Sequence, residues 1–223
     1  MMFLSEVFED AIRGPWETAG LDVQFRIKDE GDMAEVYFQG TVSEDDWRIN
    51  FDFIIEPYHD MPVKWLAHGG FVQGYKSVRD SIMPRINTKK YVFISGYSLG
   101  AAYAQLLLED IRFNHPEIDA GAIVYGAPRV FYLPPKAVRD RLEPMIRVNN
   151  FGDMVTTVPP LWVGYRHVGG LRRIGSLKHF FSVMFPIKQW MDFPTAKAHL
   201  IPEYRYSLKE ENIAIQTGSR KRT

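Results

Sequence analysis

The stretch Tyr91-Val92-Phe93-Ile94-Ser95-Gly96-Tyr97-Ser98-Leu99-Gly100-Ala101-Ala102 decides how the chain is interpreted. Its first four residues are β-branched or aromatic, which is typical of a buried strand. Residues 101–108 are mostly strong helix formers. A Gly-x-Ser-x-Gly pattern between a strand and a helix predicts a nucleophile elbow, a sharp turn that exposes the serine hydroxyl.

The two glycines explain why such a turn is feasible around Ser98. Gly96 and Gly100 lack the Cβ atoms that would collide with the neighbouring strand and helix. Backbone N–H groups at the helix N-terminus point to the place where an oxyanion would form. The alternative, a glycine-rich turn with an incidental serine, accounts less well for the flanking strand and for the small Ala101 and Ala102.

The composition describes a globular chain without an overall charge. It has 223 residues, of which 46% are hydrophobic, so we expect one domain over residues 1–223 with a flexible basic tail at 214–223. Lys+Arg and Asp+Glu both number 27, so no net field favours nucleic acid. The absence of cysteine excludes disulfides, thiol catalysis and cysteine metal sites.

The N-terminal residues lack the features of an export signal. Glu6, Glu9 and Asp10 stand where a signal peptide needs positive charge and an unbroken apolar core. No apolar run approaches the roughly 18 residues of a membrane span, and the lack of cysteine fits a reducing compartment. We therefore expect a soluble cytoplasmic protein, or one otherwise without a recognisable signal peptide.

Strand-like and helix-like segments alternate through the middle of the chain. This predicts an α/β fold with a mostly parallel central sheet, flanked by helices, and an antiparallel part at the N-terminus. Strands are expected at 23–28, 33–39, 47–53, 91–94, 118–126 and 145–149, with a hairpin over 162–174 around Gly169-Gly170. A loop is expected at 56–62, and helices at 1–13, 71–86, 101–108, 136–142, 177–191 and, as a helix or a loop, 199–209.

A serine nucleophile needs a base, and the base needs an orienting acid. In hydrolases built on this elbow the chain order is serine, then aspartate or glutamate, then histidine. Asp153 fits the acid, because it lies in the loop behind the apolar strand expected at 145–149. The aspartates that fit this role less well are Asp119, Asp140 and Asp192.

Three histidines follow Asp153 and are candidates for the base. His167 lies in a strand-like run, and His179 lies in an aromatic segment expected to be helical. His199 comes last, with Tyr204 about a helical turn later. The pattern alone favours His199 and leaves the other two open.

Six further segments carry motifs that extend the interpretation beyond the elbow. With the elbow, the motifs are Phe38-Gln39-Gly40-Thr41 with Asp46-Trp47, Ala67-His68-Gly69-Gly70-Phe71, Gly96–Gly100, Tyr125–Val130, the loop Arg147–Pro159, Gly164–Gly169, and Ala198-His199-Leu200 with Tyr204. In this order they resemble the class 3 lipases, the fungal-lipase-like branch of the α/β-hydrolases. The resemblance spans about Glu35 to Tyr204.

The resemblance implies an α/β-hydrolase fold and a serine carboxylic-ester hydrolase, a lipase or esterase acting on acylglycerol-type lipids through an acyl-enzyme. It implies a catalytic triad of Ser98, Asp153 and His199, and a structural role for His167. The oxyanion hole is expected at the backbone N–H of Leu99 and at Thr41. This chemistry needs no metal or cofactor.

Some features depart from the family pattern. Gln39 stands where the family usually has arginine, and Tyr97 replaces the usual histidine before the nucleophile. Without cysteine, the chain looks more like a bacterial or phage-type member than a secreted fungal one. The lid expected at Val42–Trp47 is short and polar, so we expect weak or absent interfacial activation.

Other functions are compatible with the same sequence. A phospholipase or an acyltransferase would share the triad, and a non-catalytic α/β-hydrolase interaction module would not need it. We expect a small ester or lipid as the substrate and no nucleic acid as a partner, and the sequence does not determine the oligomeric state. The apolar run at 180–193 is expected to belong to the core, or alternatively to an acyl-chain groove or a rim in transient contact with lipid surfaces.

Overall fold

A computed structural model describes residues 3–40, 55–58, 65–176 and 198–216. Its centre is a seven-stranded sheet in the order β1-β2-β3-β6-β7-β9-β11. The strands are β1 Glu17–Ala19, β2 Val23–Glu30, β3 Met33–Phe38, β6 Tyr91–Tyr97, β7 Asp119–Tyr125, β9 Ile146–Asn150 and β11 Gly170–Ile174. The predictions for 47–53 and 177–191, the lid, and the candidates His179 and Asp192 lie outside the described residues.

The pairing of neighbouring strands changes from antiparallel to parallel once across this sheet, and only β2 runs against the other strands. β1, β2 and β3 pair antiparallel, and from β3 to β11 every pair is parallel. The mostly parallel sheet with an antiparallel N-terminal part is therefore confirmed. Because the parallel strands run side by side, Tyr97 at the end of β6 is level with Tyr125 at the end of β7, and loops after these strands meet at one edge.

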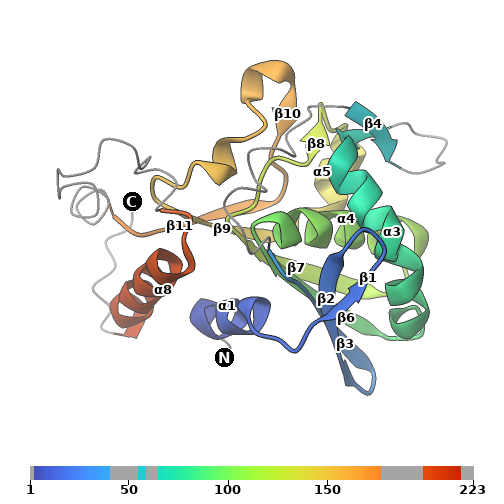
Figure 1. Cartoon of the computed structure of the whole chain (residues 1–223), viewed down its shortest axis with the longest axis horizontal. Coiled ribbons are helices and arrows are strands. Elements are labelled where there is room, and N and C mark those ends of the chain that lie inside the picture. Colours follow the sequence, from blue (N-terminus) through green and yellow to red (C-terminus); the bar gives the residue numbers. More distant parts are fainter. Residues whose placement is uncertain (1–2, 41–54, 59–64, 177–197, 217–223) are drawn as a thin grey trace.

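Helices cover both faces of the sheet (Figure 1). α3 Gly69–Ile86, α4 Leu99–Asn114 and α5 Lys136–Arg141 lie on one side. α1 Leu4–Ile12 and α8 Ile201–Gln216, from the two ends of the described chain, lie together on the other. The first three residues of the tail expected at 214–223 are thus helical, and the rest lie outside the described part.

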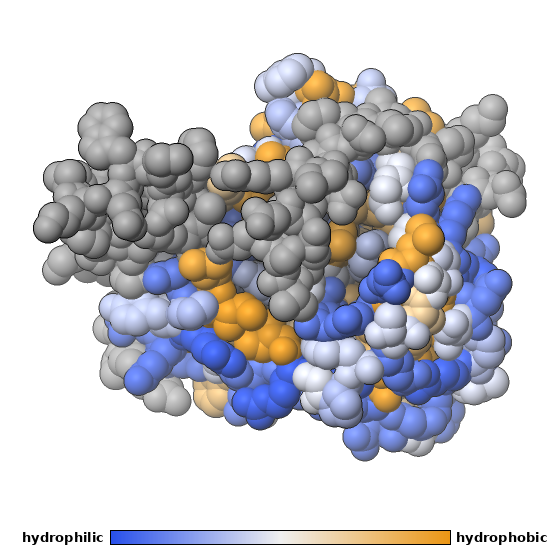
Figure 2. Space-filling view, viewed as in Figure 1, coloured by the Kyte–Doolittle hydropathy of each residue, from blue (hydrophilic) through white to orange (hydrophobic). Residues whose placement is uncertain are grey.

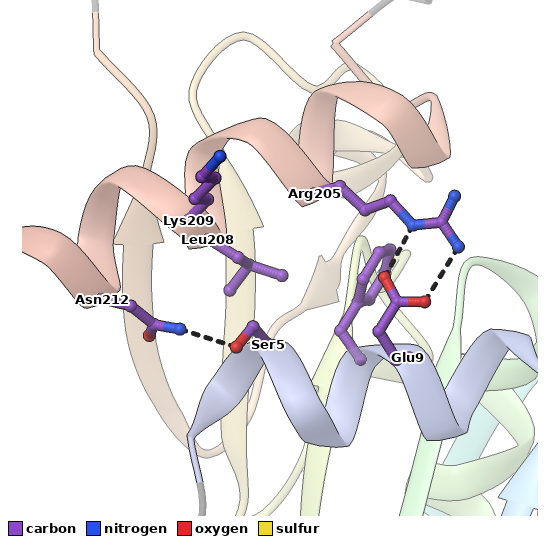
Figure 3. A pocket seen from close by; sticks show the side chains of 7 residues that line it. Ser5, Glu9, Arg205, Leu208, Lys209 and Asn212 are labelled. Carbon is purple, nitrogen blue, oxygen red and sulfur yellow. Dashed lines mark hydrogen bonds and ion pairs between the residues drawn. The ribbon is translucent and has the colours of Figure 1, made fainter.

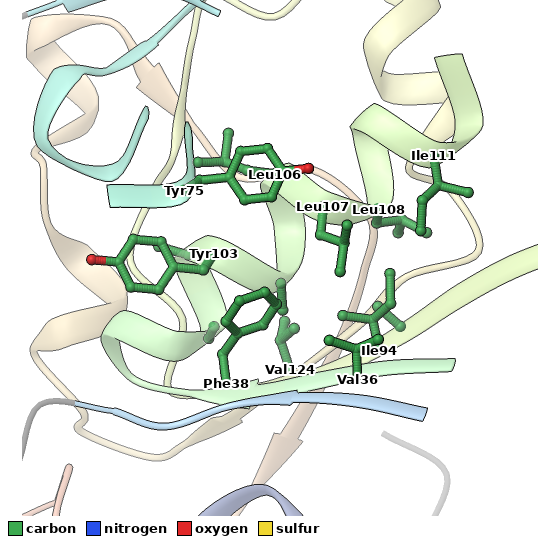
Figure 4. Packing of buried hydrophobic residues seen from close by; sticks show 14 of the residues in the cluster. Val36, Phe38, Tyr75, Ile94, Tyr103, Leu106, Leu107, Leu108, Ile111 and Val124 are labelled. Carbon is green, nitrogen blue, oxygen red and sulfur yellow. The ribbon is translucent and has the colours of Figure 1, made fainter. Parts of the chain in front are cut away.

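The larger core fills the space between the sheet, α3 and α4 (Figure 4). The side chains of Val36, Ile94 and Val124 rise from neighbouring strands and meet Leu107 of α4, and all four are fully buried. The small residues Ala101, Ala102 and Ala104 on α4 are also fully buried. Small side chains there let the helix pack close to the sheet, as the sequence predicts.

A second sheet of four short strands lies beside the central one, in the order β10-β8-β5-β4. Its strands are β4 Ile55–Tyr58, β5 Trp65–His68, β8 Phe131–Tyr132 and β10 Tyr165–Arg166. The loop expected at 56–62 is therefore wrong for its first three residues, which belong to β4. These residues pair antiparallel with β5, a partner that the local pattern does not indicate.

The hairpin expected over 162–174 is also wrong. β10 pairs with β8 in the small sheet, whereas β11 pairs in parallel with β9 in the central one. Gly169 and Gly170 form a crossing between two sheets, where Gly169 has a φ of +74° and the Gly170 N–H donates to the Met145 carbonyl at 2.8 Å. In the part of the chain that the structure describes, no helix has both the length and the apolar character to cross a membrane.

Candidate active site

Ser98 lies between the last residue of β6 and the first residue of α4, with a φ of +61°. This positive φ strains a residue with a side chain. A Cβ on Gly96 would lie 2.4 Å from the Gly100 carbonyl oxygen, and one on Gly100 would lie 2.3 Å from the Phe38 carbonyl oxygen. Both glycines are therefore required by close backbone approach, as the nucleophile-elbow interpretation predicts.

The structure brings Ser98, His199 and Asp153 together. The Ser98 hydroxyl lies 2.8 Å from His199 Nε2, and His199 Nδ1 lies 2.9 Å from Asp153 Oδ2. All three side chains are buried. Their order, with an imidazole between a hydroxyl and a carboxylate, is the arrangement needed to move a proton from the hydroxyl.

The other sequence candidates in the described chain lie elsewhere. Asp119 begins β7, at the opposite end of the strand from the edge where Ser98 lies. Asp140 lies on α5 and pairs with Lys136 at 2.5 Å. His167 donates through Nε2 to the Thr156 carbonyl at 2.7 Å, so this nitrogen is not the acceptor for the Ser98 proton.

Both oxygens of the Asp153 carboxylate are engaged. Oδ1 accepts the Val155 N–H at 2.9 Å, and Oδ2 accepts the Tyr204 hydroxyl at 2.6 Å as well as His199. Burial, and then the charge of Asp153, raise the pKa of Tyr204 well above its ordinary value. Tyr204 therefore stays a hydrogen-bond donor, and the carboxylate has one fixed orientation toward the imidazole.

Tyr97 contacts the histidine in two ways that its sequence position does not suggest. Its ring stacks on the His199 imidazole, with centroids 5.0 Å apart and planes at 16°. Its hydroxyl donates to the His199 backbone carbonyl. Burial, and then Asp153, raise the pKa of Tyr97, so this hydroxyl also remains protonated and holds the turn that carries His199.

Asn150, the last residue of β9, joins the aspartate loop to the histidine turn. Its Nδ2 donates to the Ala198 carbonyl at 2.9 Å, and its Oδ1 accepts the Ser207 hydroxyl at 2.8 Å. Its backbone N–H donates to the Tyr204 hydroxyl at 3.1 Å. Asn150 is a residue that sequence reasoning missed, because its partners lie about 50 residues away.

α8, which begins two residues after His199, is joined to α1 by polar side chains (Figure 3). Arg205 on α8 pairs with Glu9 on α1 through Nε at 2.6 Å and Nη2 at 2.9 Å, and Asn212 donates to Ser5 at 2.6 Å. A hollow of about 250 Å³ separates the two helices, and its walls include none of the three predicted triad residues. It is a gap in helix packing, crossed by these contacts.

Two side chains, Arg129 and His167, fix the loop after Asp153. Arg129 donates to the carbonyls of Thr157 and, at 2.8 Å, Pro159, and Arg147 donates to the Val168 carbonyl at 2.7 Å. Burial, and then the charge of Arg147, lower the pKa of His167 to about 3. His167 is thus neutral at physiological pH and donates to the loop without adding charge.

The expected oxyanion donors can be placed only in part. Leu99 begins α4, and N–H groups in a first helical turn have no intrahelical acceptor. The end of β3 lies against the elbow, because a Cβ on Gly40 would lie 2.7 Å from the Tyr97 carbonyl oxygen. Thr41 lies outside the described residues. Within the described ranges, no three histidine, aspartate or glutamate side chains gather in a way that could hold a metal ion.

Comparisons with known proteins relate this geometry to a family. A secreted mono- and diacylglycerol lipase of Fusarium solani is 28% identical over 142 residues, which are 59% of this chain and 41% of that protein. The chain thus spans about two fifths of that relative's length.

The secreted relative overturns our expectation of a cytoplasmic protein. Part of that expectation rested on the charges of Glu6, Glu9 and Asp10, which belong to α1 of the folded domain.

Solved structures share the fold. Triacylglyceride lipase of Rhizomucor miehei has a TM-score of 0.66 at 20% identity, covering 83% of this chain and 78% of its own. Lipase II of Rhizopus niveus has a TM-score of 0.62 at 25% identity, covering 73% and 66%. A triacylglycerol lipase whose catalytic centre is described as a serine protease triad has a TM-score of 0.65 at 20% identity, covering 83% and 78%. The α/β-hydrolase fold is therefore confirmed.

The sequence profile of one family covers more than half of the chain. It matches residues 35–162, which include the end of β3, the elbow and the aspartate loop. Five of the seven motifs quoted from the sequence lie within this range, and the motifs at Gly164–Gly169 and at Ala198-His199-Leu200 follow it. The chain therefore belongs to the lipase (class 3) family.

Proposed function

We propose that this chain hydrolyses carboxylic esters of acylglycerol-type lipids, as a lipase or esterase with Ser98 as nucleophile. The observation that carries the proposal is the continuous contact from Ser98 through His199 to Asp153, with distances of 2.8 and 2.9 Å. Membership of the lipase family supports the same reaction. Since the Fusarium relative is secreted, we place the enzyme outside the cell.

In the first half of the reaction, Ser98 Oγ attacks the ester carbonyl carbon and His199 Nε2 takes the serine proton. The negatively charged Asp153 stabilises the imidazolium and keeps Nδ1 as the donor. As the tetrahedral intermediate collapses, the ester C–O bond breaks and His199 gives its proton to the departing alcohol. An acyl group remains on Ser98.

In the second half, water attacks the acyl-enzyme while His199 again serves as the base, and the fatty acid leaves with Ser98 restored. The charge on the carbonyl oxygen is stabilised by the Leu99 N–H at the N-terminus of α4, together with Thr41. Loss of one such donor typically slows the reaction about 10²–10³-fold.

Hydrolysis of p-nitrophenyl esters from acetate to palmitate tests the proposal. Ser98→Ala should lower kcat/KM by about a thousandfold or more. Ser95→Ala is the matched control, because Ser95 lies three residues earlier on β6 and its hydroxyl donates to the Ile123 carbonyl at 2.7 Å. Equal turnover by wild type and Ser98→Ala would show that the elbow serine is not the nucleophile.

Covalent labelling separates the hydrolase from a non-catalytic interaction module. A fluorophosphonate should label wild type and Ser95→Ala but not Ser98→Ala. A folded wild-type sample that takes up no label would favour the module. An added alcohol then separates hydrolysis from acyl transfer, because a transferase would place the acyl group on the alcohol in preference to water.

A further inference from the structure

Three large apolar side chains gather at the meeting point of β8 and the short helix η2 Leu161–Val163. The exposed fractions are 57% for Leu133, 51% for Leu161 and 85% for Trp162. The Leu133 N–H donates to the Gly164 carbonyl at 3.0 Å, which joins the two segments. We call these three residues the apolar tip. Neighbouring exposed apolar side chains of this size are unusual on a soluble protein.

The apolar tip projects from the rest of the molecule. In Figure 1 the segment that carries β10 rises above the other elements, and in Figure 2 this projecting end is pale with small apolar areas. The base is rigid, because Phe131 and Tyr165 on the strands below are 1% exposed. A convex end on a rigid base suits insertion into a soft phase and not capture of a ligand in a groove.

The backbone at the tip is prepared for an apolar environment. The Val163 and Gly164 N–H groups donate to the carbonyls of Pro160 and Leu161, at 3.2 and 3.0 Å. Arg166 also donates to the Leu161 carbonyl, at 2.6 Å. Paired backbone groups remove the main cost of entering hydrocarbon. The indole of a tryptophan has an apolar body and a polar N–H, which favours the boundary between lipid and water.

The charged side chains around the tip indicate which kind of lipid surface it would bind. Within residues 129–139 and 158–169, Arg129 is buried and Lys136 pairs with Asp140 at 2.5 Å, so the basic groups that these two segments add to the surface are Arg166 and the exposed Arg139. Arg166 lies at the base of the tip itself. Basic groups beside an apolar anchor attract anionic head groups. Basic groups beside exposed apolar side chains therefore favour a lipid surface with anionic head groups as the partner of this face.

The tip is joined to the candidate active site by a short, fixed connection. η2 begins eight residues after Asp153, and Arg129 holds the carbonyls of Thr157 and Pro159 between them. Exposed apolar side chains also flank the triad residues, namely Met154 next to Asp153 and Leu200 next to His199. A surface that holds the tip therefore lies in fixed relation to the aspartate loop.

We propose that Leu133, Leu161 and Trp162 form a lipid-surface anchor that inserts into a layer containing anionic head groups. The anchor deepens the proposed function, since it would present the active site to an aggregated ester. Binding is nevertheless measured without catalysis. Ser98→Ala protein is used as the background, so that no lipid is consumed and a failure of the hydrolase proposal does not affect the result.

Co-sedimentation with phosphatidylcholine vesicles, with and without phosphatidylglycerol, tests the anchor. The Leu161→Ser/Trp162→Ser variant should bind the mixed vesicles about tenfold more weakly, because the apolar contact is lost. Leu21→Ser is the matched control: Leu21 is 66% exposed, in the turn between β1 and β2 at the opposite edge of the central sheet from β11. If the double variant binds as strongly as wild type, the anchor proposal is wrong. If wild type binds equally to vesicles with and without phosphatidylglycerol, the preference for anionic head groups is wrong.

A second measurement reports the depth of the tip directly. Brominated lipid should quench wild-type fluorescence, and Trp162→Phe, which keeps an apolar side chain, should still bind but lose most of this quenching. Unchanged quenching in Trp162→Phe would exclude insertion of the tip. Gel filtration tests whether the tip instead contacts a second copy of the chain. If wild type forms a dimer and does not bind vesicles, and the double variant is a monomer, the tip is a dimer contact and not a lipid anchor.

With Ser98 intact, the double variant should hydrolyse soluble p-nitrophenyl acetate at the wild-type rate. Its rate on an emulsified triacylglycerol should fall by about tenfold, in step with the weaker surface binding. Equal losses on both substrates would indicate damage to the active site and would contradict an anchor. Urea unfolding at an unchanged midpoint shows that both variants are folded.

Discussion

At the scale of single residues, the Tyr204 hydroxyl is one of the groups that orient Asp153. Tyr204→Phe removes the donor at 2.6 Å and leaves the buried Asn150 N–H without this acceptor. We expect kcat to fall about tenfold with little change in KM, and the free energy of unfolding to fall by about 1–2 kcal/mol. Ester kinetics and urea unfolding measure the two effects.

Tyr91→Phe is the control for Tyr204→Phe, because Tyr91 is 51% exposed at the start of β6 and should lose neither activity nor stability. If Tyr204→Phe loses stability but keeps its full kcat, the hydroxyl supports the fold alone. The positioning role would then be wrong.

His167 makes stability depend on pH. Its folded pKa, about 3, lies below the ordinary value of 6.5, because of burial and the nearby Arg147 and Arg129, which outweigh the opposing contact with the Thr156 carbonyl. The unfolded state therefore takes up a proton first as the pH falls through 6.5. This contribution to stability is complete above that pH and decreases down to about pH 3, with a loss of about 2 kcal/mol between pH 7.5 and pH 5.

His167→Gln tests this dependence, since its amide nitrogen can still donate to Thr156 but does not titrate. Urea unfolding at pH 7.5 and pH 5 should show a smaller difference for the variant than for wild type. An identical difference would mean that other groups cause the acid sensitivity.

Sequence patterns identify the candidate catalytic residues more readily than they identify the side chains that orient those residues. Ser98 is indicated by its own neighbours, and Asp153 follows its strand directly. Tyr97 and Asn150 act through partners 102 and 48 residues away in the chain. No local pattern contains such a partner, so these roles emerge only when the elbow, the aspartate loop and the histidine turn are placed together.

At the scale of elements, the junction of β3, β6 and α4 depends on backbone contact. Gly100→Ala would place a Cβ 2.3 Å from the Phe38 carbonyl oxygen. Backbone atoms cannot move aside cheaply, so we expect the free energy of unfolding to fall by about 2–4 kcal/mol. Ester hydrolysis should decline too, because the displaced atoms adjoin Ser98. Urea unfolding and ester kinetics measure both.

Gly121→Ala is the matched variant on β7, where a Cβ would meet nothing within 4 Å. It should leave activity intact and raise stability by about 0.5 kcal/mol, through the lower entropy of the unfolded chain. Similar losses in both variants would refute close packing as the reason for Gly100.

Elements with a strong local signal are predictable, and those defined by distant pairing are not. The apolar run before Gly96 and the helix formers after it are enough to predict β6 and α4. β8 has two residues, and its partners in β5 and β10 lie more than 30 residues away on either side. The Gly169-Gly170 pair favours a hairpin locally, but β11 gains five paired positions with β9 instead.

At the scale of the whole molecule, the two ends of the chain meet beneath the candidate active site. Phe8 on α1 stacks with Tyr204 at 5.6 Å and contacts the edge of Tyr97 at the same distance. These tyrosines contact Asp153 and His199. The N-terminal helix thus supports a site whose residues come from the middle and the end of the sequence, an arrangement that helical periodicity near residues 3–12 cannot reveal.

Phe8→Ala tests this support. Phe8 is fully buried, so truncation leaves a cavity among three aromatic rings and should lower the free energy of unfolding by about 3–4 kcal/mol. Because the cavity adjoins Tyr97 and Tyr204, kcat/KM measured well below the unfolding transition should also fall by several-fold. Urea unfolding and ester kinetics on the same sample measure both effects.

Glu9→Gln provides the comparison on the same helix, because the Glu9–Arg205 ion pair is partly exposed and contributes less than about 1 kcal/mol. If Phe8→Ala loses stability while its folded form keeps full activity, α1 stabilises the sheet without positioning the proposed triad. If both variants lose activity equally, the ion pair and not the aromatic cluster aligns α8 and the histidine turn before it.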